Sequence, residues 1–146
     1  ISDYQVPYVL MHLQGDEKTF HQSKSYEDLL DELILFFSEK ITKLQALGVN
    51  DLIIDPGFGF SKSIEQNFEL LRKLQAFTVF DLPILVGLSR KSMLYKTLDI
   101  TAKEALSATS VAHYEALRQG AKLLRAHDVK EAKETITLFN LLNPNC

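Results

Sequence analysis

Internal cysteines, long apolar runs and an excess of basic charge are all lacking in this chain, and each absence excludes a class of protein. The single cysteine, Cys146, is the last of 146 residues, so an internal disulfide and a cysteine-based zinc site are both excluded. No apolar run approaches the length of about 20 residues that a membrane-spanning helix needs. The net charge of −3 gives no electrostatic basis for binding nucleic acid or an anionic membrane.

The composition is that of an ordinary globular protein. Apolar residues make up 46% and charged residues 24% of the sequence, and no linker rich in proline, glycine or serine interrupts it. We therefore predict a single domain over residues 1–146. The cysteine content and the lack of a visible signal peptide fit a cytoplasmic protein. The chain begins with Ile1 rather than Met, shortly before a predicted strand, which predicts that it is part of a longer protein.

Short continuous apolar runs recur along the chain and predict buried parallel strands that are covered on both faces. The runs are residues 9–11, 52–54, 84–86 and 123–124. Helical stretches of about 15 to 20 residues separate them, so we predict an α/β fold made of successive β-α units. These patterns alone leave two architectures open, a flavodoxin-like sheet and half of a (β/α)₈ barrel.

Polar residues mark the expected helix boundaries. Pairs of residues three apart resemble capping boxes, in which a side-chain oxygen accepts a backbone hydrogen bond at the start of a helix. These pairs are Ser25 with Asp28, Ser63 with Gln66, Thr101 with Glu104, and Asp128 with Glu131. Gly48 and Gly120 are predicted to end the first and third helical stretches.

Polar residues also collect where the predicted strands end, which is the ligand-binding face of parallel α/β folds. Asp55 ends the second strand and precedes a turn rich in glycine. The third strand leads into the sequence GLSRKS at residues 87–92, and the fourth leads into RAHD at residues 125–128. Helix N-termini at this edge favour anions. An acid, a lysine and an Arg-x-His pair at neighbouring strand ends predict a site for a polar heterocycle and an anionic group.

Other polar residues near these strand ends are given structural roles. Asp128 is expected to cap the last helix, and Arg90 by itself is typical of a solvated loop. His12 is expected to be a hydrogen-bonded residue at the rim of the site rather than a catalyst. His21 and His113 carry no functional signal.

Four segments together resemble the dihydropteroate synthase family, in order and at family-like spacing. They are LMHLQG at residues 10–15, IIDPGFGFSK at 53–62, LVGLSRKS at 85–92 and LRAHDV at 124–129. The resemblance implies the C-terminal half of a (β/α)₈ TIM barrel, from the fifth strand to the last helix. It also implies an enzyme that condenses hydroxymethyl-dihydropterin pyrophosphate with p-aminobenzoate, giving dihydropteroate and pyrophosphate.

The same resemblance implies a role for particular positions. Asp55 would hydrogen-bond the amino-pyrimidinone edge of the pterin, and Lys91 would lie beside both substrates. Arg125 would stack along the pterin plane and reach the anion region, where His127 would bind pyrophosphate. Lys91, Arg125 and His127 are therefore the expected catalytic residues. The other expected substrate-binding residues are Phe60, Ser89 and Ser92 at the p-aminobenzoate pocket, and Met11 and Gly87 beside the pterin.

The resemblance further implies a Mg²⁺ cofactor whose ligand lies in the other half of the barrel, so no metal ligand is expected in this chain. A homodimer is the expected assembly, and the isolated chain is expected to be inactive. Two alternatives remain open. One is a pterin-binding methyltransferase domain, and the other is a non-catalytic half barrel that associates with a copy of itself. The SRKS loop and the Arg-x-His pair favour the synthase, because a pyrophosphate leaving group needs cations.

Overall fold

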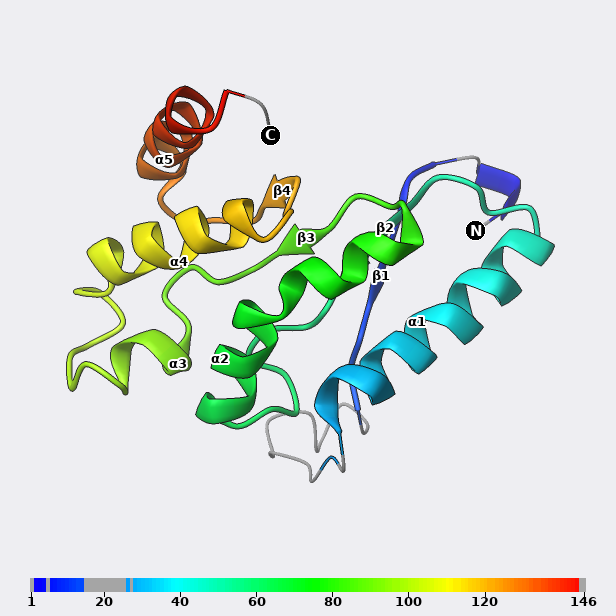
Figure 1. Ribbon diagram of the computed structural model, residues 1–146, viewed down its shortest axis with the longest axis horizontal. Coiled ribbons are helices and arrows are strands. Elements are labelled where there is room, and N and C mark those ends of the chain that lie inside the picture. The colour runs from blue at the N-terminus through cyan, green and yellow to red at the C-terminus, as the bar shows by residue number, and fades with distance from the viewer. Residues whose placement is uncertain (1, 5, 15–25, 27, 145–146) are drawn as a thin grey trace.

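The computed structural model describes residues 2–4, 6–14, 26 and 28–144. Strands and helices alternate along these residues (Figure 1). In chain order the elements are the 3₁₀ helix η1 (Ser2–Tyr4), β1 (Tyr8–Met11), α1 (Leu29–Ala46), β2 (Leu52–Asp55), α2 (Ile64–Arg72), the 3₁₀ helix η2 (Leu74–Phe80), β3 (Leu85–Val86), α3 (Ser92–Tyr95), α4 (Leu106–Arg118), β4 (Leu123–Leu124) and α5 (Val129–Leu142).

The strands lie side by side in sequence order and all run parallel. β1 pairs with β2 from Tyr8 opposite Leu52 onwards, and β3 pairs with β4. A parallel bridge between Ile54 and Ile84 joins the two pairs into one row. The predicted α/β fold with parallel strands is confirmed. A flavodoxin-like sheet has the strand order 2-1-3-4-5, so the sequential order of the described strands excludes that architecture.

Side chains alternate between the two faces of the strand row, as the pleat of a strand requires. The face packed against the helices is formed by the buried residues Leu10, Leu52, Ile54, Ile84 and Val86. On the other face Val9 is 42% and Leu123 is 37% exposed, while Ile53 and Leu85 are half-buried. We call Val9, Ile53, Leu85 and Leu123 the open face. The prediction of cover on both faces is therefore wrong for the described residues. A continuous apolar run therefore does not show that both faces of a strand are covered, because the described helices cover only one face here.

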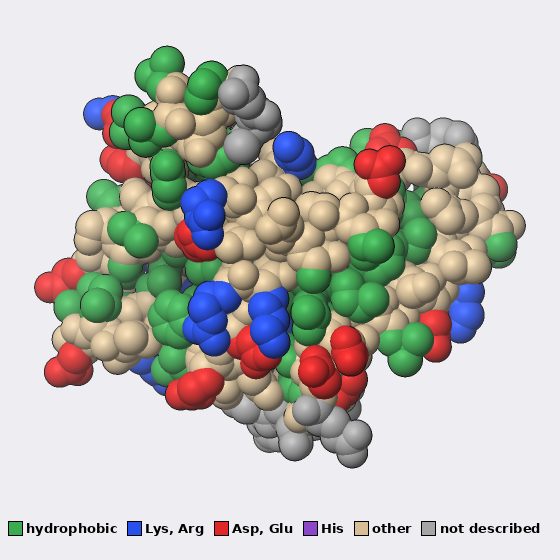
Figure 2. Space-filling model, viewed as in Figure 1, with side chains coloured by type: hydrophobic (Ala, Val, Ile, Leu, Met, Phe, Trp, Pro, Cys, Tyr) green, Lys and Arg blue, Asp and Glu red, His purple; other side chains and the backbone are tan. Residues whose placement is uncertain are grey.

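Helices α1, α2 and α4 form a layer along the strands, each in contact with the next, and α5 packs against α4 (Figure 1). The core lies between this layer and the strand row. Leu33 and Phe37 of α1 are fully buried, and the Phe37 ring packs edge-on against Phe77 with ring centroids 5.7 Å apart. Figure 2 shows the same view of the surface, on which acidic and basic side chains are interspersed with apolar ones. Within the described part of the chain, no helix is long and apolar enough to cross a membrane.

One predicted capping box is confirmed, and another is revised. Ser63 caps α2 by accepting a bond from the Gln66 N–H, and the Gln66 side chain accepts one from Ser63 in return. For α1 the N-cap is Asp28, whose carboxylate accepts two backbone N–H bonds at the start of the helix. The predicted partner Ser25 lies outside the described residues.

The remaining two capping predictions are wrong. Thr101 and Glu104 do bond to one another, at 2.8 Å between backbone nitrogen and carboxylate oxygen, but they close a turn ahead of α4. Asp128 stands at the N-cap position of α5, yet its side chain makes no capping bond. Its carboxylate forms an ion pair with Arg90 instead. Sequence spacing could not reveal this competition, because Arg90 lies on a different strand end.

The predicted helix ends are confirmed. α1 and α4 stop shortly before Gly48 and Gly120, which have positive φ angles of 80° and 98°. The third crossover differs from the single helix expected, because it contains the short α3 followed by α4. The start of α3 therefore comes directly after Lys91, at the edge of the candidate site.

Candidate functional site

Pleat alternation brings predicted site residues from different strands onto one face. Met11 lies opposite Asp55 in the β1–β2 register. Each comes two residues after the open-face residue of its strand, Val9 or Ile53, and so points to the same face. Gly87 and Arg125 hold the equivalent places beyond β3 and β4. A β-carbon at Gly87 would lie 2.9 Å from Nη2 of Arg125, so the guanidinium lies directly across this glycine. These four residues therefore form one row at the carboxyl ends of the strands.

The turn after β2 fixes the buried carboxylate of Asp55. Its Oδ1 accepts a hydrogen bond from the Gly57 N–H at 2.8 Å. Gly57 has a φ angle of 75°, and a β-carbon there would overlap the carbonyl oxygen of His12. Only glycine combines this φ with such a close approach. One oxygen of Asp55 therefore closes the turn, and this bond sets the direction of the whole carboxylate.

Three cations act on the Asp55 carboxylate. Burial raises the pKa of Asp55 above its ordinary value, and the Gly57 N–H bond opposes that rise. The positive charges of Arg125, Lys91 and Lys62 oppose it as well. The acid, the lysine and the arginine that were predicted to form one site thus interact electrostatically in the fold.

Lys62 lies in the IIDPGFGFSK segment but was not among the predicted binding residues. Its buried Nζ donates to the carbonyl oxygens of Gly57 and Phe60, both at 3.2 Å. Nζ also lies 3.1 Å from Nδ1 of His12, and this ring nitrogen must be the acceptor because an ammonium has only donors. Burial lowers the pKa of Lys62 to about 8. The buried lysine therefore links the turn after β2 to the residue that follows β1. His12 is hydrogen-bonded, as expected.

Acid is expected to destabilise the fold through His12. Burial, and then the charge of Lys62, lower the pKa of His12 from 6.5 to about 3. The unfolded chain takes up this proton below its ordinary pKa, whereas the folded protein takes it up only near pH 3. The free energy of unfolding should therefore fall as the pH drops through this window, by up to about 1.4 kcal/mol per pH unit. Urea unfolding at about pH 7, 6 and 5 measures the slope.

The matched variant for this test is His12→Asn. Its amide oxygen can accept the Lys62 bond, and it has no proton to take up in this range. The variant should lose less stability than the wild type between neutral and acidic pH. Equal slopes in the two proteins would show that His12 does not carry this pH dependence.

Lys91 reaches the site across an aromatic ring. Its Nζ lies 4.3 Å from the centroid of the Phe60 ring, a cation–π contact. Its side chain also crosses Gly59, where a β-carbon would come within 2.9 Å of Cδ. Burial, and then the charge of Arg125, lower the pKa of Lys91. The structure thus brings together the lysine and the aromatic wall that the sequence predicted.

A cavity of about 290 Å³ opens beside these strand ends. It is lined by Gly87, Ser89, Lys91, Arg125, Ala126 and His127. Two cations and a histidine therefore face one small space, an arrangement that suits an anion.

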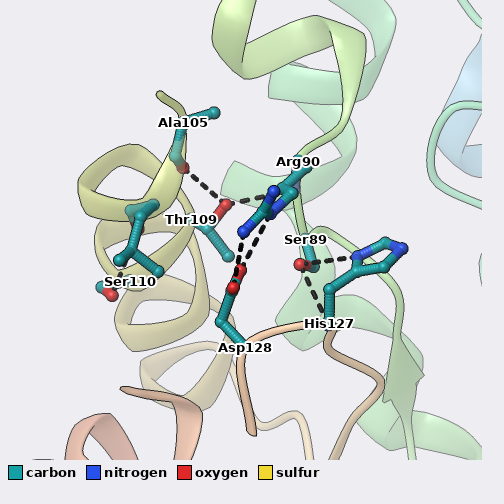
Figure 3. A network of polar contacts seen from close by, with 8 residues as sticks. Ser89, Arg90, Ala105, Thr109, Ser110, His127 and Asp128 are labelled. Atoms are coloured by element: carbon teal, nitrogen blue, oxygen red, sulfur yellow. Dashed lines mark hydrogen bonds and ion pairs between the residues drawn. The ribbon is translucent and has the colours of Figure 1, made fainter. Parts of the chain in front are cut away.

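The buried Ser89 orients His127 at this cavity. The Ser89 Oγ accepts the backbone N–H of His127 at 3.2 Å and lies 3.0 Å from its ring Nδ1. The imidazole extends away from Ser89, so its other nitrogen remains at the outer end of the ring (Figure 3). Two contacts to one hydroxyl thus hold both the backbone and the ring of His127.

Four predicted substrate-binding residues are absent from the cavity lining, namely Asp55, Met11, Phe60 and Ser92. Met11 is half-buried beside Asp55, and Phe60 lies beneath Lys91. Ser92 is the first residue of α3 and is half-buried next to Lys91 in the chain. Their places fit a site that extends from the cavity towards β1 and β2.

Within the described ranges, no group of three His, Cys, Asp or Glu side chains is placed to hold a metal ion. The charges acting on Asp55 are cations, which disfavour a further positive ion at that carboxylate. The described residues therefore do not fit Mg²⁺, and the magnesium ion implied by the resemblance stays a prediction.

Comparison with known proteins gives this arrangement a family. A family profile described as "Pterin binding enzyme" matches residues 1–127. The chain belongs to this family. The match includes the ends of all described strands and the whole predicted set of site residues.

Individual relatives of this chain are named dihydropteroate synthase. The synthase of Escherichia coli strain K12 is 41% identical over 133 residues, which cover 90% of this chain and 47% of the relative. The crystal structure of the Yersinia pestis synthase with a sulfonamide drug complex has a TM-score of 0.94 and 36% identity, and the match covers 98% of this chain and 53% of that one. The Xanthomonas albilineans synthase with 4-aminobenzoic acid has a TM-score of 0.90 and 34% identity, covering 97% and 51%.

These relatives confirm the resemblance to dihydropteroate synthase that the four sequence segments carry. They also show a difference in length. The chain spans about half the length of the relatives it matches, although nearly all of the chain takes part in each match.

Proposed function

We propose that this chain supplies the pterin and p-aminobenzoate sites of a dihydropteroate synthase. The observation that carries the proposal is the position of the Asp55 carboxylate. The Gly57 N–H fixes it on the same face of the strand row as the open face, and the positive charges of Lys91 and Arg125 act on it. An acid held among cations at strand ends suits a substrate that has both a polar ring and an anionic group. Relatives of the same fold that are named dihydropteroate synthase support this reading.

We infer that the architecture is half of a (β/α)₈ barrel formed by a single domain over residues 1–146. The sequential parallel strands and the outer helix layer are those of such a barrel. The TM-score of 0.94 over 53% of the Yersinia pestis synthase supports the same inference. In this arrangement the open face would be the barrel interior, and the site would lie at the carboxyl ends of its strands.

Asp55 would bind the pterin. An ionised carboxylate offers only acceptors, so it matches the adjacent N–H donors of an amino-pyrimidinone edge. The second partner would be Arg125, whose flat guanidinium lies across Gly87 and can stack along a ring plane. Met11, opposite Asp55, would complete this part of the site.

The cationic cavity would hold the pyrophosphate, and the neighbouring residues would hold p-aminobenzoate. Arg125 and His127 are both exposed at the cavity, so their donors can reach an anion. Lys91 lies between this cavity and Phe60, where it can contact both substrates. Phe60 would form the wall of the p-aminobenzoate pocket together with Ser92.

The proposed reaction needs positioning and charge stabilisation rather than a protein nucleophile. The bond between the pterin methylene carbon and the pyrophosphate oxygen breaks, leaving a pterin-stabilised cation. The amine nitrogen of p-aminobenzoate then bonds to that carbon and loses a proton. Lys91, Arg125 and His127 would stabilise the departing negative charge, and Asp55 would keep the pterin aligned.

Removing a cavity donor should weaken pyrophosphate binding more than p-aminobenzoate binding. Arg125→Ala and His127→Ala each delete a donor from the proposed anion site, at a cost of about 1.5–3 kcal/mol for a charged hydrogen bond. In a complete synthase that contains this chain, inhibition by inorganic pyrophosphate should weaken by about 10- to 100-fold. The KM for p-aminobenzoate should change much less.

Arg118→Ala is the control for charge alone, because Arg118 is exposed on α4 and pairs with Glu115 away from the cavity. It should leave both constants unchanged. Equal pyrophosphate inhibition in the two cavity variants and the wild type would contradict the assignment of the anion site.

The cavity also bears on the alternative of a methyltransferase. A methyl transfer releases no pyrophosphate, so that reaction gives no reason for two cations and a histidine around one cavity. The homodimer likewise stays a prediction. An apolar groove of about 600 Å³ between α2, α3 and α4, with Val111 71% and Leu98 55% exposed, supports association through the helix layer.

A further inference from the structure

The pairing of β3 with β4 continues beyond the strands as a series of side-chain contacts in the same register. In the strands Leu85 lies opposite Leu123. Ser89 and His127, which bond to one another after the strands end, are separated by 38 residues. The same separation of 38 relates Arg90 to Asp128. The two loops therefore lie alongside one another, one residue of each loop opposite one residue of the other.

The Arg90–Asp128 contact has the geometry of a strong ion pair. Nε of Arg90 lies 3.0 Å from Oδ2 of Asp128, and Nη2 lies 2.6 Å from Oδ1. Two parallel bonds between a planar guanidinium and a carboxylate fix orientation as well as distance. Both side chains are partly buried, with exposed fractions of 31% and 18%. The pair is therefore better shielded from solvent than an ordinary surface salt bridge.

The backbone of Arg90 is also held. Its φ angle is 54°, in the left-handed region that is unfavourable for a residue with a side chain. The Arg90 N–H donates to Oγ1 of Thr109 at 3.1 Å, and this hydroxyl donates to the Ala105 carbonyl at 2.7 Å. Thr109 is buried on α4. Contacts from two other elements thus keep Arg90 in an unfavourable backbone conformation.

The two anchored residues each stand next to a proposed catalytic residue. Lys91 directly follows Arg90, and His127 directly precedes Asp128. In Figure 3, Arg90 and Asp128 face one another on the α4 side of the loops, whereas the His127 ring points the other way. The ion pair therefore links the two loops on their α4 side. Lys91 and His127 line the cavity on the opposite side of these loops.

We propose that Arg90 and Asp128 are positioning residues that set the spacing between Lys91 and His127. The pair itself contacts neither the cavity nor, in our proposal, a substrate. What Lys91 and His127 bind rests on the proposed function, but the coupling between the two loops rests only on the contacts described above. Loss of the ion pair should let the loops move apart, and a misplacement of about 1 Å between acting groups can cost roughly 10²-fold in rate.

The test compares Asp128→Asn and Arg90→Lys with the wild type in a complete synthase that contains this chain. The first removes the charge at constant shape, and the second keeps the charge but loses the planar fork. Both variants should bind inorganic pyrophosphate at least about tenfold more weakly and lower kcat more than they change the KM for p-aminobenzoate. Arg118→Gln, which breaks an exposed pair with Glu115 on α4, is the matched control and should do neither.

A second measurement does not depend on substrate. The ring ¹⁵N signals of His127 report its Nδ1 contact with Ser89, and the signals of the buried His12, which contacts Lys62 at the end of β1, serve as an internal reference. The His127 signals should shift in Asp128→Asn and return towards their wild-type positions in the charge-swapped double variant Arg90→Asp/Asp128→Arg. If the wild type binds no pyrophosphate, the proposed function fails while this measurement still decides the coupling. Unchanged His127 signals in Asp128→Asn, or a loss of pyrophosphate affinity no larger than in Arg118→Gln, would overturn the proposal.

Discussion

Replacing Asp55 with asparagine is expected to weaken pterin binding by about 10- to 100-fold while leaving the fold in place. The amide oxygen of asparagine can still accept the Gly57 N–H bond, so the turn after β2 keeps its geometry. The other carboxylate oxygen becomes an NH₂ group, which would oppose the N–H donors of the pterin. A buried, unsatisfied donor costs about 1–3 kcal/mol. The change also removes a negative charge that interacts with Lys62, Lys91 and Arg125.

Calorimetric titration with a pterin measures this effect directly, and urea unfolding shows whether the fold is intact. Asp51→Asn is the matched control, because Asp51 is an exposed aspartate that directly precedes β2, at the end of the strand away from Asp55. It should bind the pterin like the wild type. An unchanged pterin affinity in Asp55→Asn would remove Asp55 from the binding site.

The 146-residue chain by itself is expected to form dihydropteroate at less than about one hundredth of the rate of a complete synthase. The chain aligns with about half of each relative, and the cavity residues Arg125 and His127 are exposed in its structure. A reactive pterin cation must be kept from water and held against the amine, which an open site cannot do. The assay uses the pterin pyrophosphate, p-aminobenzoate and Mg²⁺, beside the Escherichia coli relative. Turnover within about tenfold of that relative, from a monomeric sample, would refute the expectation.

The open face should make the same chain associate with itself. Val9, Ile53, Leu85 and Leu123 present an apolar row that the described helices do not cover. Leu123→Glu should therefore lower the light-scattering mass relative to the wild type, because it disrupts association through the open face. Val79→Glu replaces an apolar residue of η2 that is 72% exposed and does not belong to the open face, so it should leave the mass unchanged.

The parts of the structure that follow from local pattern were predictable from the sequence. The apolar runs predicted each strand to within a residue or two, and Ser63 with Gln66 marked the start of α2. The glycines at the ends of α1 and α4 were equally informative, because a positive φ angle is a local requirement. Asp55, Lys91 and Arg125 were predicted to meet because parallel strands end at a common edge, and their mutual electrostatic effects agree with that prediction.

What the sequence could not supply were the contacts decided by three-dimensional competition. Lys62 follows the β2 turn closely, but nothing in the sequence reveals that it is buried against His12. Asp128 has the spacing of a helix cap, but the guanidinium of Arg90 offers its carboxylate two bonds instead of one. The faces of the strands were also misjudged, because an apolar residue in a run does not reveal whether another element covers it.

The constant offset between the β3 and β4 segments limits where this chain can change in length. Residues gained or lost in the turn at 97–104 lie between α3 and α4, outside the paired segments, and would leave the offset partners in contact. One residue inserted between Leu124 and Arg125 would instead carry Arg125 to the helix side of the row, because successive side chains alternate. It would also move His127 and Asp128 out of register with their partners Ser89 and Arg90. Natural length variation and engineered insertions should therefore concentrate in the crossover and avoid the few residues after each strand.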